Sequence, residues 1–595
     1  MQEMKKTNPS NPFIYSTPDQ IKDPNHALNL FVDVLRDFYL IESPGNTIVN
    51  GPRGSGKSMM FRIMKPDCQK ISLGKPLHEI SYFSVYVPIK NTSLNIEELK
   101  YLKGKHGENI LNEHVLTTYF SIALMERLNE EDYSLYDKAL EEVNSFYNNL
   151  FLKCLSNAGY DVKAIQNEEF TSVNSIFEKM VFLLEDIQNV FSTYVQRVTL
   201  GDENLTYQGT LCLYRNFLLP LIKGIVNFSF LPKEKPIYLL IDDADLLSDS
   251  QTRILNSWVS FRSTSFVCFK ISTQMNYKTY YTSNSSNKID SPHDYHEINL
   301  SDIYTSNPSE GYKDSLKSII EKRLNFNSGI KVTAEEFFPV YDKQEVAIKV
   351  IEDKLKEKSG YDYAYRNARV NYMLDLPNEY SYNYGGFNQL VHLSSGIIRN
   401  FIDMSFKMYD KTVRMNRSSE NQIVSIPSSI QNDEIKEYAN WILQQLDKSI
   451  DDDHLNPIQS NRYKQLKTLI SSMGKAFRLF LESDASERRK FSFYYDGDVS
   501  KEVKDVLKLG VSEGLFHHST HGSKTGLGRS HKYVMNRMLS PIYKLDPFSF
   551  SGYLYITPDK IELAMKDEKA FLKYIKERIH KGDKEEENNQ IEIDF

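Results

Sequence analysis

Short apolar runs alternate with longer amphipathic segments along the first half of the chain. Five of these runs are typical of buried strands, because each is short and is closed by a turn or a polar cluster. They are Thr47–Asn50, Tyr82–Ile89, Ile237–Ile241, Phe266–Ile271 and Tyr295–Asn299. Helical patterns separate most of them. The pattern therefore predicts a parallel sheet covered by helices on both faces.

The segment between the second and third strands is unusually long and has the spacing of buried helices. One stripe follows the i, i+4, i+7 positions of a helix: Ile176, Met180, Leu183, Ile187 and Phe191. A second stripe runs from Leu116 to Leu128. We expect residues 95–230 to form a helical insertion in the core. The alternative is a single, larger helical core.

After the fifth strand the patterns are mostly helical. Tyr312–Leu324 and Gly386–Tyr409 are expected to be helices of a lid. Between them, Ser359–Tyr384 is rich in Tyr and Asn, and we expect a loop or a second insertion there. Lys501–Gly514 is typical of an amphipathic helix, and a strand, a Gly-rich turn and a second strand follow it. A helix that leads into a Gly-tipped hairpin is the outline of a winged helix.

Length and composition are those of a multidomain globular protein. The 595 residues are 40% hydrophobic and 25% charged, which is enough for a large core. With a formal charge of −7, binding of nucleic acid would have to come from a local basic patch. The four cysteines are far apart and match no zinc or disulfide pattern. Without a signal sequence or a run of 18 apolar residues, a cytoplasmic protein without membrane contact is expected.

A phosphate-binding motif follows the first predicted strand. The pattern GxxxxGK[ST] is satisfied by Gly51, Pro52, Arg53, Gly54, Ser55, Gly56, Lys57 and Ser58. Glycines let backbone N–H groups turn toward phosphate oxygens, and a helix that starts here adds the positive end of its dipole. We expect Lys57 to bridge the β- and γ-phosphates of ATP and Ser58 to bind Mg²⁺. A strand is predicted before the motif and a helix after it, and this context favours a true phosphate loop over a chance match.

The third predicted strand ends in two carboxylates. Asp242 closes an apolar strand, which is where a ligand for Mg²⁺ and its water is needed. Asp243 is then placed to polarise the attacking water. The alternative is an ordinary helix-cap cluster at residues 243–248. The phosphate motif upstream favours the metal site.

Taken together, these motifs resemble the AAA+ initiator-type ATPases, the group of the origin-recognition and cell-division-control proteins. More specifically, the chain resembles the bacterial proteins described as origin-recognition-like AAA ATPases. The resemblance rests on GPRGSGKS, LLIDDADLL, FKISTQ, SSGIIRNFID and the winged-helix-like segment, and it covers most of residues 10–330 and 385–555. It implies an α/β fold: a three-layer AAA+ parallel-sheet core with a helical insertion, a helical lid and a C-terminal winged-helix domain.

Domain boundaries are expected where the patterns change. They are 1–94 for the start of the AAA+ core with the phosphate loop, 95–230 for the helical insertion, 231–310 for the rest of the core, 311–431 for the lid with its Tyr-rich insertion, 432–560 for the winged-helix-like domain, and 561–595 for a C-terminal helix and polar tail. Residues 581–595 are polar, and we expect them to be disordered.

The resemblance implies further sites. Thr273, or its neighbour Ser272, ends the fourth strand where the family places its polar sensor of the γ-phosphate. Arg399, in the segment GIIR, matches the lid arginine that reports the nucleotide state, and Asn11–Phe13 resembles the segment under the adenine base. The alternatives are an ordinary strand end and a surface arginine. The implied catalytic set is Lys57, Asp242, Asp243, Thr273 and Arg399.

The chain departs from the family at the arginine that a neighbouring subunit usually supplies. No arginine occurs between Arg262 and Arg323. An arginine finger is worth several decades of rate in phosphoryl transfer, so its absence predicts slow hydrolysis. Arg262, or Arg366 or Arg369 from the second insertion, could substitute. The aspartate at position 243, where many hydrolysing members have glutamate, also reaches less far.

The hairpin of the predicted winged helix is locally basic. It carries Lys524, Arg529 and Lys532 without a nearby carboxylate, and such cations can contact DNA phosphates without reading sequence. The alternative is a wing that docks a protein. Four histidines lie here and are expected to face solvent or DNA, with a metal site as the weaker interpretation: His517, His518, His521 and His531.

We therefore expect an ATP-binding NTPase, a nucleotide-controlled switch that recognises DNA or a partner protein. The resemblance implies a homo-oligomer and, as a biological setting, defence against phage together with a separate protein effector. One alternative is a replication-initiator-like, DNA-loading ATPase. The other is an oligomeric scaffold that binds ATP and does not hydrolyse it.

Overall fold

The fold is described from a computed structural model of the chain. It describes residues 11–581 except 16, 35–37, 91–106, 167, 202–204, 262, 275–276, 285, 301–309, 378–379, 417–421, 453–455, 484–488, 523–528 and 549–551. Within that part of the chain, no helix combines the length and the apolar character needed to cross a membrane.

A five-stranded sheet forms the centre of the first half of the chain. Its strands are β1 (Thr47–Asn50), β2 (Ser84–Pro88), β3 (Ile237–Asp242), β4 (Val267–Thr273) and β5 (His296–Asn299). They run in the order β2-β3-β4-β1-β5, and every neighbouring pair is parallel. The parallel sheet predicted from the apolar runs is confirmed. Because all strands point the same way, the carboxyl ends of β1, β3 and β4 meet at one edge.

Helices cover both faces of this sheet. In β3, Leu239 belongs to one apolar cluster and Leu240 to the other, as the alternation of a doubly buried strand requires. The three-layer α/β architecture is thereby confirmed. On the Leu240 side lie α2 (Phe38–Glu42) and α3 (Lys57–Met64), flanked by α1 (Pro24–Leu30) and α4 (Pro66–Leu73); α6 (Glu108–Asn129) and α11 (Asp249–Val259) cover the Leu239 side.

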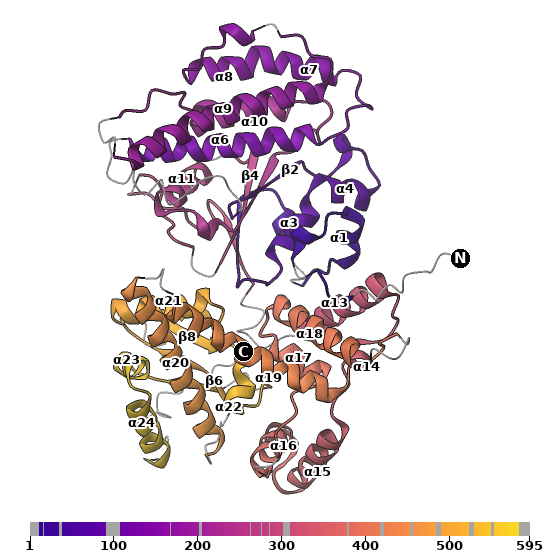
Figure 1. Cartoon of the computed structure of the whole chain (residues 1–595), viewed down its shortest axis with the longest axis vertical. Helices are drawn as coiled ribbons and strands as arrows, with labels where there is room; N and C mark the ends of the chain where they lie inside the picture. Colours follow the sequence, from indigo (N-terminus) through magenta and orange to yellow (C-terminus); the bar gives the residue numbers. More distant parts are fainter. Residues whose placement is uncertain are drawn as a thin grey trace.

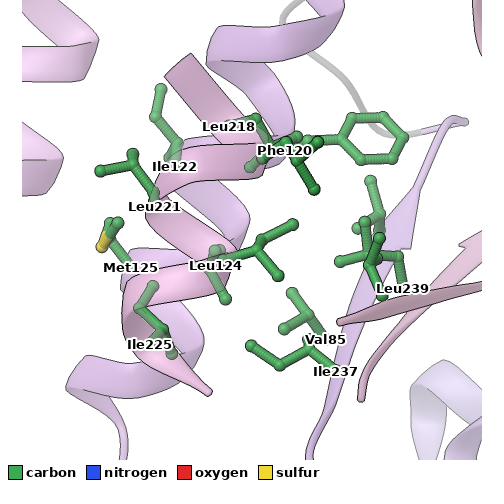
Figure 2. Packing of buried hydrophobic residues seen from close by; sticks show 14 of the residues in the cluster. Val85, Phe120, Ile122, Leu124, Met125, Leu218, Leu221, Ile225, Ile237 and Leu239 are labelled. Carbon is green, nitrogen blue, oxygen red and sulfur yellow. The ribbon is translucent and has the colours of Figure 1, made fainter. Parts of the chain in front are cut away.

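The long segment between β2 and β3 is helical, and it packs on the sheet. Its remaining helices are α7 (Ala139–Phe146), α8 (Leu152–Asn157), α9 (Val173–Thr199) and α10 (Leu219–Ile225). In Figure 2, Leu124 of α6 points toward Val85 and Ile237 of the strands, and Leu221 of α10 belongs to the same buried cluster. Figure 1 shows these helices stacked above the sheet. The segment is an insertion in sequence, yet in space it shares one continuous core with the sheet.

The lid lies below the sheet in Figure 1. Its helices are α13 (Glu310–Ser328), α14 (Ala334–Phe337), α15 (Asp342–Ser359), α16 (Tyr361–Asp375), α17 (Phe387–Leu393) and α18 (Ile398–Met415). The loop considered for Ser359–Tyr384 is wrong, because α16 occupies much of it and pairs with α15. Its buried positions are the small or flexible Ala364, Ala368, Val370 and Met373, while several tyrosines stay exposed.

The segment predicted as one helix at Gly386–Tyr409 is two helices. The break falls at Ser395 and Gly396, whose φ angles of 54° and 71° are left-handed and interrupt the helix. Ser395 Oγ accepts a hydrogen bond from the backbone N–H of Arg537, at 2.6 Å. The break is therefore also a joint between the lid and the C-terminal unit.

The C-terminal unit is a winged-helix domain. A four-stranded sheet of order β7-β8-β6-β9 packs against long helices. The predicted helix and hairpin are present as α21 (Lys501–Ser512), β7 (Phe516–Gly522) and β8 (Arg529–Met535). The other elements are α19 (Ser428–Ile450), α20 (Pro457–Leu481), β6 (Lys490–Tyr495), α22 (Ser540–Tyr543), β9 (Gly552–Tyr555), α23 (Pro558–Lys566) and α24 (Glu568–Lys581). Residues 582–595 of the predicted polar tail lie outside the described residues.

Candidate functional site

The phosphate-binding motif forms a tight loop between β1 and α3. Gly54 and Gly56 have φ angles of +84° and +105°, which side chains other than glycine rarely adopt. The loop leads straight into Lys57, the first residue of α3. Gly51 is fixed from the neighbouring strand, because its N–H donates to the carbonyl of Thr273 at 3.2 Å. The loop thus has the curled backbone and the helix start that a phosphate group requires.

Lys57 is buried at the base of this loop. Its Nζ donates to the carbonyls of Gly51, at 2.7 Å, and Pro52, at 3.0 Å, and the residue is 7% exposed. Burial lowers the pKa of Lys57 to about 8, and the nearby Asp242 carboxylate opposes that shift. The ammonium therefore lies at the phosphate loop within the field of the β3 carboxylates.

Asp242, the last residue of β3, is held at both of its oxygens. The Ser272 hydroxyl donates to Oδ1, and the Tyr86 hydroxyl donates to Oδ2 at 2.9 Å. Asp242 is 2% exposed. Burial, and then the charge of Asp242, raise the pKa of Tyr86 well above its ordinary value, so the phenol stays protonated and donates. The carboxylate is fixed in orientation at the strand end.

Asp243 begins the turn after β3. Its φ of 57° is left-handed, a conformation that is uncommon for residues other than glycine and often marks functional positions. Its backbone N–H donates to Ser272 Oγ at 3.1 Å. Burial, and then the adjacent Asp242, raise the pKa of its carboxyl group above the ordinary value. Both carboxylates face the same cavity as Lys57.

The two sensor candidates at the end of β4 are placed differently. Ser272 contacts Asp242 and Asp243 directly. The Thr273 hydroxyl instead donates to the carbonyl of Gln274 at 3.2 Å, and the Thr273 backbone holds the phosphate loop. Both side chains are buried. Only Ser272 of the pair touches the carboxylates, because neighbouring residues of a strand point to opposite faces.

Arg399 brings the lid onto the phosphate loop. Its backbone N–H donates to the carbonyl of Gly54 at 3.1 Å. A Cβ added to Gly54 would lie 2.5 Å from the Cβ of Arg399, so glycine is required by the approach as well as by φ. The Arg399 side chain lines the cavity beside Lys57. Burial raises the pKa of Asp403, and the charge of Arg399 opposes that shift.

These residues surround one cavity of about 200 Å³ between the core and the lid. Several further residues, which no sequence pattern predicted, also line it: Thr17, Pro18, Asp19, Ile21, Leu30, Phe31, Val32, Val34, Tyr86, Lys90, Ile319, Arg323 and Ile402. The aliphatic and aromatic members give the cavity an apolar wall, which suits a nucleobase. No local motif identified them, because they come from the N-terminal segment, β2 and two lid helices.

The segment Asn11–Phe13 does not take the place implied for it. Phe13 is fully buried in the lid core, against Phe337, Phe338 and Tyr409. It is absent from the cavity wall, where Thr17–Ile21 lies instead. The apolar side chain of Phe13 is buried in the lid core and does not contact the cavity.

The donor set fits a nucleotide with a divalent cation. Ser58 and Asp242 supply the oxygen ligands that Mg²⁺ prefers, and the loop supplies N–H groups and Lys57. In the described part of the chain, the buried Ser55 Oγ has no hydrogen-bond partner. A buried polar atom without a partner is costly unless a ligand satisfies it.

The substitute arginines fall in different places. Arg262 lies outside the described residues. Arg369 donates to both carboxylate oxygens of Glu345 at 3.0 Å and to the Tyr382 hydroxyl at 2.7 Å, so it is committed within the chain. Arg366 is exposed on α16.

The wing is described in part. Lys524 lies outside the described residues, as does the tip of the hairpin, and Arg529 is the first residue of β8. Lys532 is half-buried, and burial lowers its pKa. The expectation that the histidines face solvent is wrong for His517, which is buried in the domain with its pKa lowered to about 4 by burial. The imidazoles of His518 and His531 lie 3.0 Å apart (Nε2 to Nδ1).

The sequence matches one known family, and its structure is similar to those of two archaeal proteins. The sequence model of a family described as ORC-CDC6-like matches residues 11–360 and 348–554. No curated protein matches the sequence. Among solved structures, the Orc1 protein of Aeropyrum pernix in complex with DNA is similar over 91% of this chain and 97% of that chain, with 12% identity and a TM-score of 0.28. Cdc6p from Pyrobaculum aerophilum is similar over 96% and 98%, with 11% identity and a TM-score of 0.25. Both TM-scores are low, and the fold assignment stands on the chain's own sheet order.

Proposed function

The chain belongs to the ORC-CDC6-like family of AAA+ proteins, and we propose that it is an ATP-binding switch that hydrolyses ATP slowly and recognises DNA or a partner protein. One observation carries the proposal. Lys57 of the phosphate loop, Asp242 of β3 and Arg399 of the lid line a single cavity, although they lie far apart in sequence.

The proposed division of labour follows from the chemistry of these groups. Lys57 and the loop N–H groups bind the β- and γ-phosphates, and Ser58 and Asp242 hold Mg²⁺. When bound, Mg²⁺ neutralises charge on the reacting phosphate oxygens. Asp243 orients the attacking water and accepts its proton. Arg399 reaches the γ-phosphate from the same chain, so closing the lid depends on which nucleotide is present.

Slow turnover is proposed because no arginine lies between Arg262 and Arg323. A trans arginine stabilises the charge of the transition state and is worth several decades of rate. Arg369 is bound to Glu345 and cannot serve without breaking that pair. The site then favours long-lived ATP states, which suits a switch in the cytosol better than a motor.

We propose that the winged-helix domain is the part of the switch that binds DNA or the partner protein. Membership of the ORC-CDC6-like family supports binding of nucleotide and DNA, and the sequence of the hairpin supplies Arg529 and Lys524 as phosphate-binding cations. Defence against phage with a separate effector, in a homo-oligomer, is the biological setting we propose. A DNA-loading initiator is the second candidate, since the same wing serves it; an ATP-bound scaffold without hydrolysis is the third.

Equilibrium binding of a fluorescent ATP analogue to Lys57→Ala tests the proposal. We expect a loss of affinity of about a hundredfold, because charge-assisted hydrogen bonds are worth about 1.5–3 kcal/mol each. Lys75→Ala is the matched control, since Lys75 is exposed on the same lobe. Equal affinity of Lys57→Ala and wild type would contradict the site. Turnover of ATP with and without duplex DNA separates the three candidates.

A further inference from the structure

The carboxylate proposed to hold the divalent cation is itself held by two hydroxyls from different strands. Ser272 of β4 donates to Oδ1 of Asp242, and Tyr86 of β2 donates to Oδ2 at 2.9 Å. Ser272 is a neighbour to be expected, because it lies level with Asp242 near the end of the adjacent parallel strand. The register of the sheet does not lead one to expect a contact with Tyr86. The residue of β2 that pairs with Asp242 is Pro88, and Tyr86 lies two residues before it.

The length of the tyrosine side chain lets its hydroxyl reach Asp242 in spite of this difference of two residues in register. Tyr86 lines the cavity together with Ser58 and Asp242, so its hydroxyl lies beside the place of the cation. On its other side, the ammonium of Lys65 lies 4.1 Å from the ring centre. A cation over the ring face holds the ring in place. The hydroxyl is therefore presented to Asp242 from a fixed position, and its oxygen carries the hydrogen that the carboxylate accepts.

We propose that Tyr86 is a positioning residue for the divalent cation, which orients Asp242 so that the lone pair left free on Oδ2 faces Ser58 and the phosphate loop. The inference rests on the proposed function, and it adds a residue that lies outside both the phosphate loop and the motif that ends β3. Oδ1 also accepts from the backbone N–H of Asp243 at 3.1 Å. A carboxylate accepts at about four lone-pair sites, so three donated hydrogen bonds leave one acceptor site, on Oδ2, for the cation. Donors behind a metal ligand typically change metal affinity by about 10–100-fold when they are removed.

Tyr86→Phe removes the hydroxyl and keeps the ring over Lys65. Tyr238→Phe is the matched control, because its hydroxyl also donates one hydrogen bond in the same sheet, to the carbonyl of Glu42 at 2.9 Å. Neither change alters net charge. Ser272→Ala, which removes the donor on the other oxygen, gives a second measurement of the same effect.

The measurement is binding of a fluorescent, non-hydrolysable ATP analogue, titrated with Mg²⁺ and repeated with EDTA. In Tyr86→Phe we expect the Mg²⁺ concentration for half-maximal tightening to rise about tenfold, with nucleotide affinity in EDTA and the thermal unfolding midpoint as in wild type. Ser272→Ala should shift the Mg²⁺ requirement in the same direction, and Tyr238→Phe should not shift it.

The possible outcomes separate the two claims. A wild-type protein whose nucleotide binding does not respond to Mg²⁺ would overturn the proposed function, and this inference with it. Normal Mg²⁺-dependent binding in wild type together with an unchanged Mg²⁺ requirement in Tyr86→Phe would overturn the inference alone. Equal loss of affinity with and without Mg²⁺ would also overturn it, because it would show that Tyr86 acts on the nucleotide.

Discussion

The backbone N–H of Arg399 donates to the carbonyl of Gly54 at 3.1 Å. The lid helix α18 therefore begins directly on the phosphate loop, and no side chain intervenes. A change in the backbone conformation of the loop therefore alters the hydrogen bond that holds the first turn of α18. This contact gives the proposed switch a physical basis, because the groups that bind phosphate and the groups that move are one hydrogen bond apart.

Gly54→Ala is expected to disrupt this contact. The new Cβ would meet the Cβ of Arg399 at 2.5 Å, and a left-handed φ costs a residue with a side chain about 1–3 kcal/mol. Gly45→Ala carries similar backbone strain, at φ +114°, with nothing within 4 Å. We expect both to lower the free energy of unfolding and only Gly54→Ala to weaken ATP binding, by about tenfold or more. Thermal unfolding and ATP affinity are the measurements; equal ATP affinity in the two variants would contradict the steric role.

Asp243→Asn is expected to bind ATP as wild type does and to trap it. The amide cannot accept the proton of the attacking water, whereas the loop and Lys57 still hold the phosphates. Since burial raises the pKa of Asp243, the acid limb of kcat in wild type should lie above the ordinary aspartate value of about 3.9. Asp245→Asn serves as the control, because Asp245 accepts from the Gln274 N–H. Hydrolysis by Asp243→Asn at the wild-type rate would exclude Asp243 as the base.

ATP affinity is expected to fall as pH rises through about 8. The free protein holds Lys57 with a pKa of about 8, because burial disfavours the ammonium. Phosphate favours the charged form, so binding raises this pKa and takes up a proton above it. Calorimetry in two buffers of different ionisation enthalpy, at pH 7 and pH 9, measures that uptake. A proton uptake of zero at pH 9 would show that Lys57 is charged before ATP arrives.

Neutralising the wing is expected to weaken DNA binding equally for unrelated duplexes. Each lost phosphate contact should reduce the slope of log K against log salt by about 0.9. We expect Lys524→Ala with Arg529→Ala to show this effect, and Lys532→Ala to add little because Lys532 is half-buried. Fluorescence anisotropy over a salt series provides the slopes. Unchanged slopes in the double variant would indicate that the wing docks a protein.

The rate of ATP hydrolysis per subunit is expected to stay nearly constant on dilution. Arg399 comes from the same chain and acts without a neighbour, so Arg399→Ala should slow hydrolysis at every concentration. Arg369→Ala should change stability more than rate, because Arg369 is paired with Glu345. Arg262 would be identified as a finger supplied in trans by two results together. The wild-type rate per subunit would fall steeply on dilution, and Arg262→Ala would be as slow at every concentration as the diluted wild type. In that case the protein is a conventional ring ATPase.

The sheet was predictable from the sequence because strands buried on both faces leave continuous apolar runs. All five strands fall within a few residues of the predicted runs. The helix α16 was harder, because its buried face uses Ala364 and Ala368, and its tyrosines conceal the period. The strands β6 and β9 were not predicted, and they pair with each other across a gap of more than fifty residues.

The site was predictable where its residues form contiguous motifs and hidden where contacts are long-range. Gly51–Ser58 and Asp242 belong to local patterns. Tyr86 meets Asp242 across 156 residues, and Arg323 reaches the cavity from a lid helix. For Asn11–Phe13 a place in the site was predicted where none exists, because Phe13 lies in the lid core. A resemblance of three residues cannot distinguish a cavity wall from a nearby core. Such contacts depend on how elements pack, which no short pattern encodes.

The joint at Ser395 has a consequence for how chains of this family can vary in length. Ser395 is fixed to Arg537 of the winged-helix domain, and Arg399 is fixed to Gly54. One residue added or removed between them would turn α18 by about 100°, and Arg399 would leave the cavity. Insertions and deletions among relatives should therefore spare residues 395–399, whereas the α15–α16 pair, which projects from the lid in Figure 1, can change length without moving either joint.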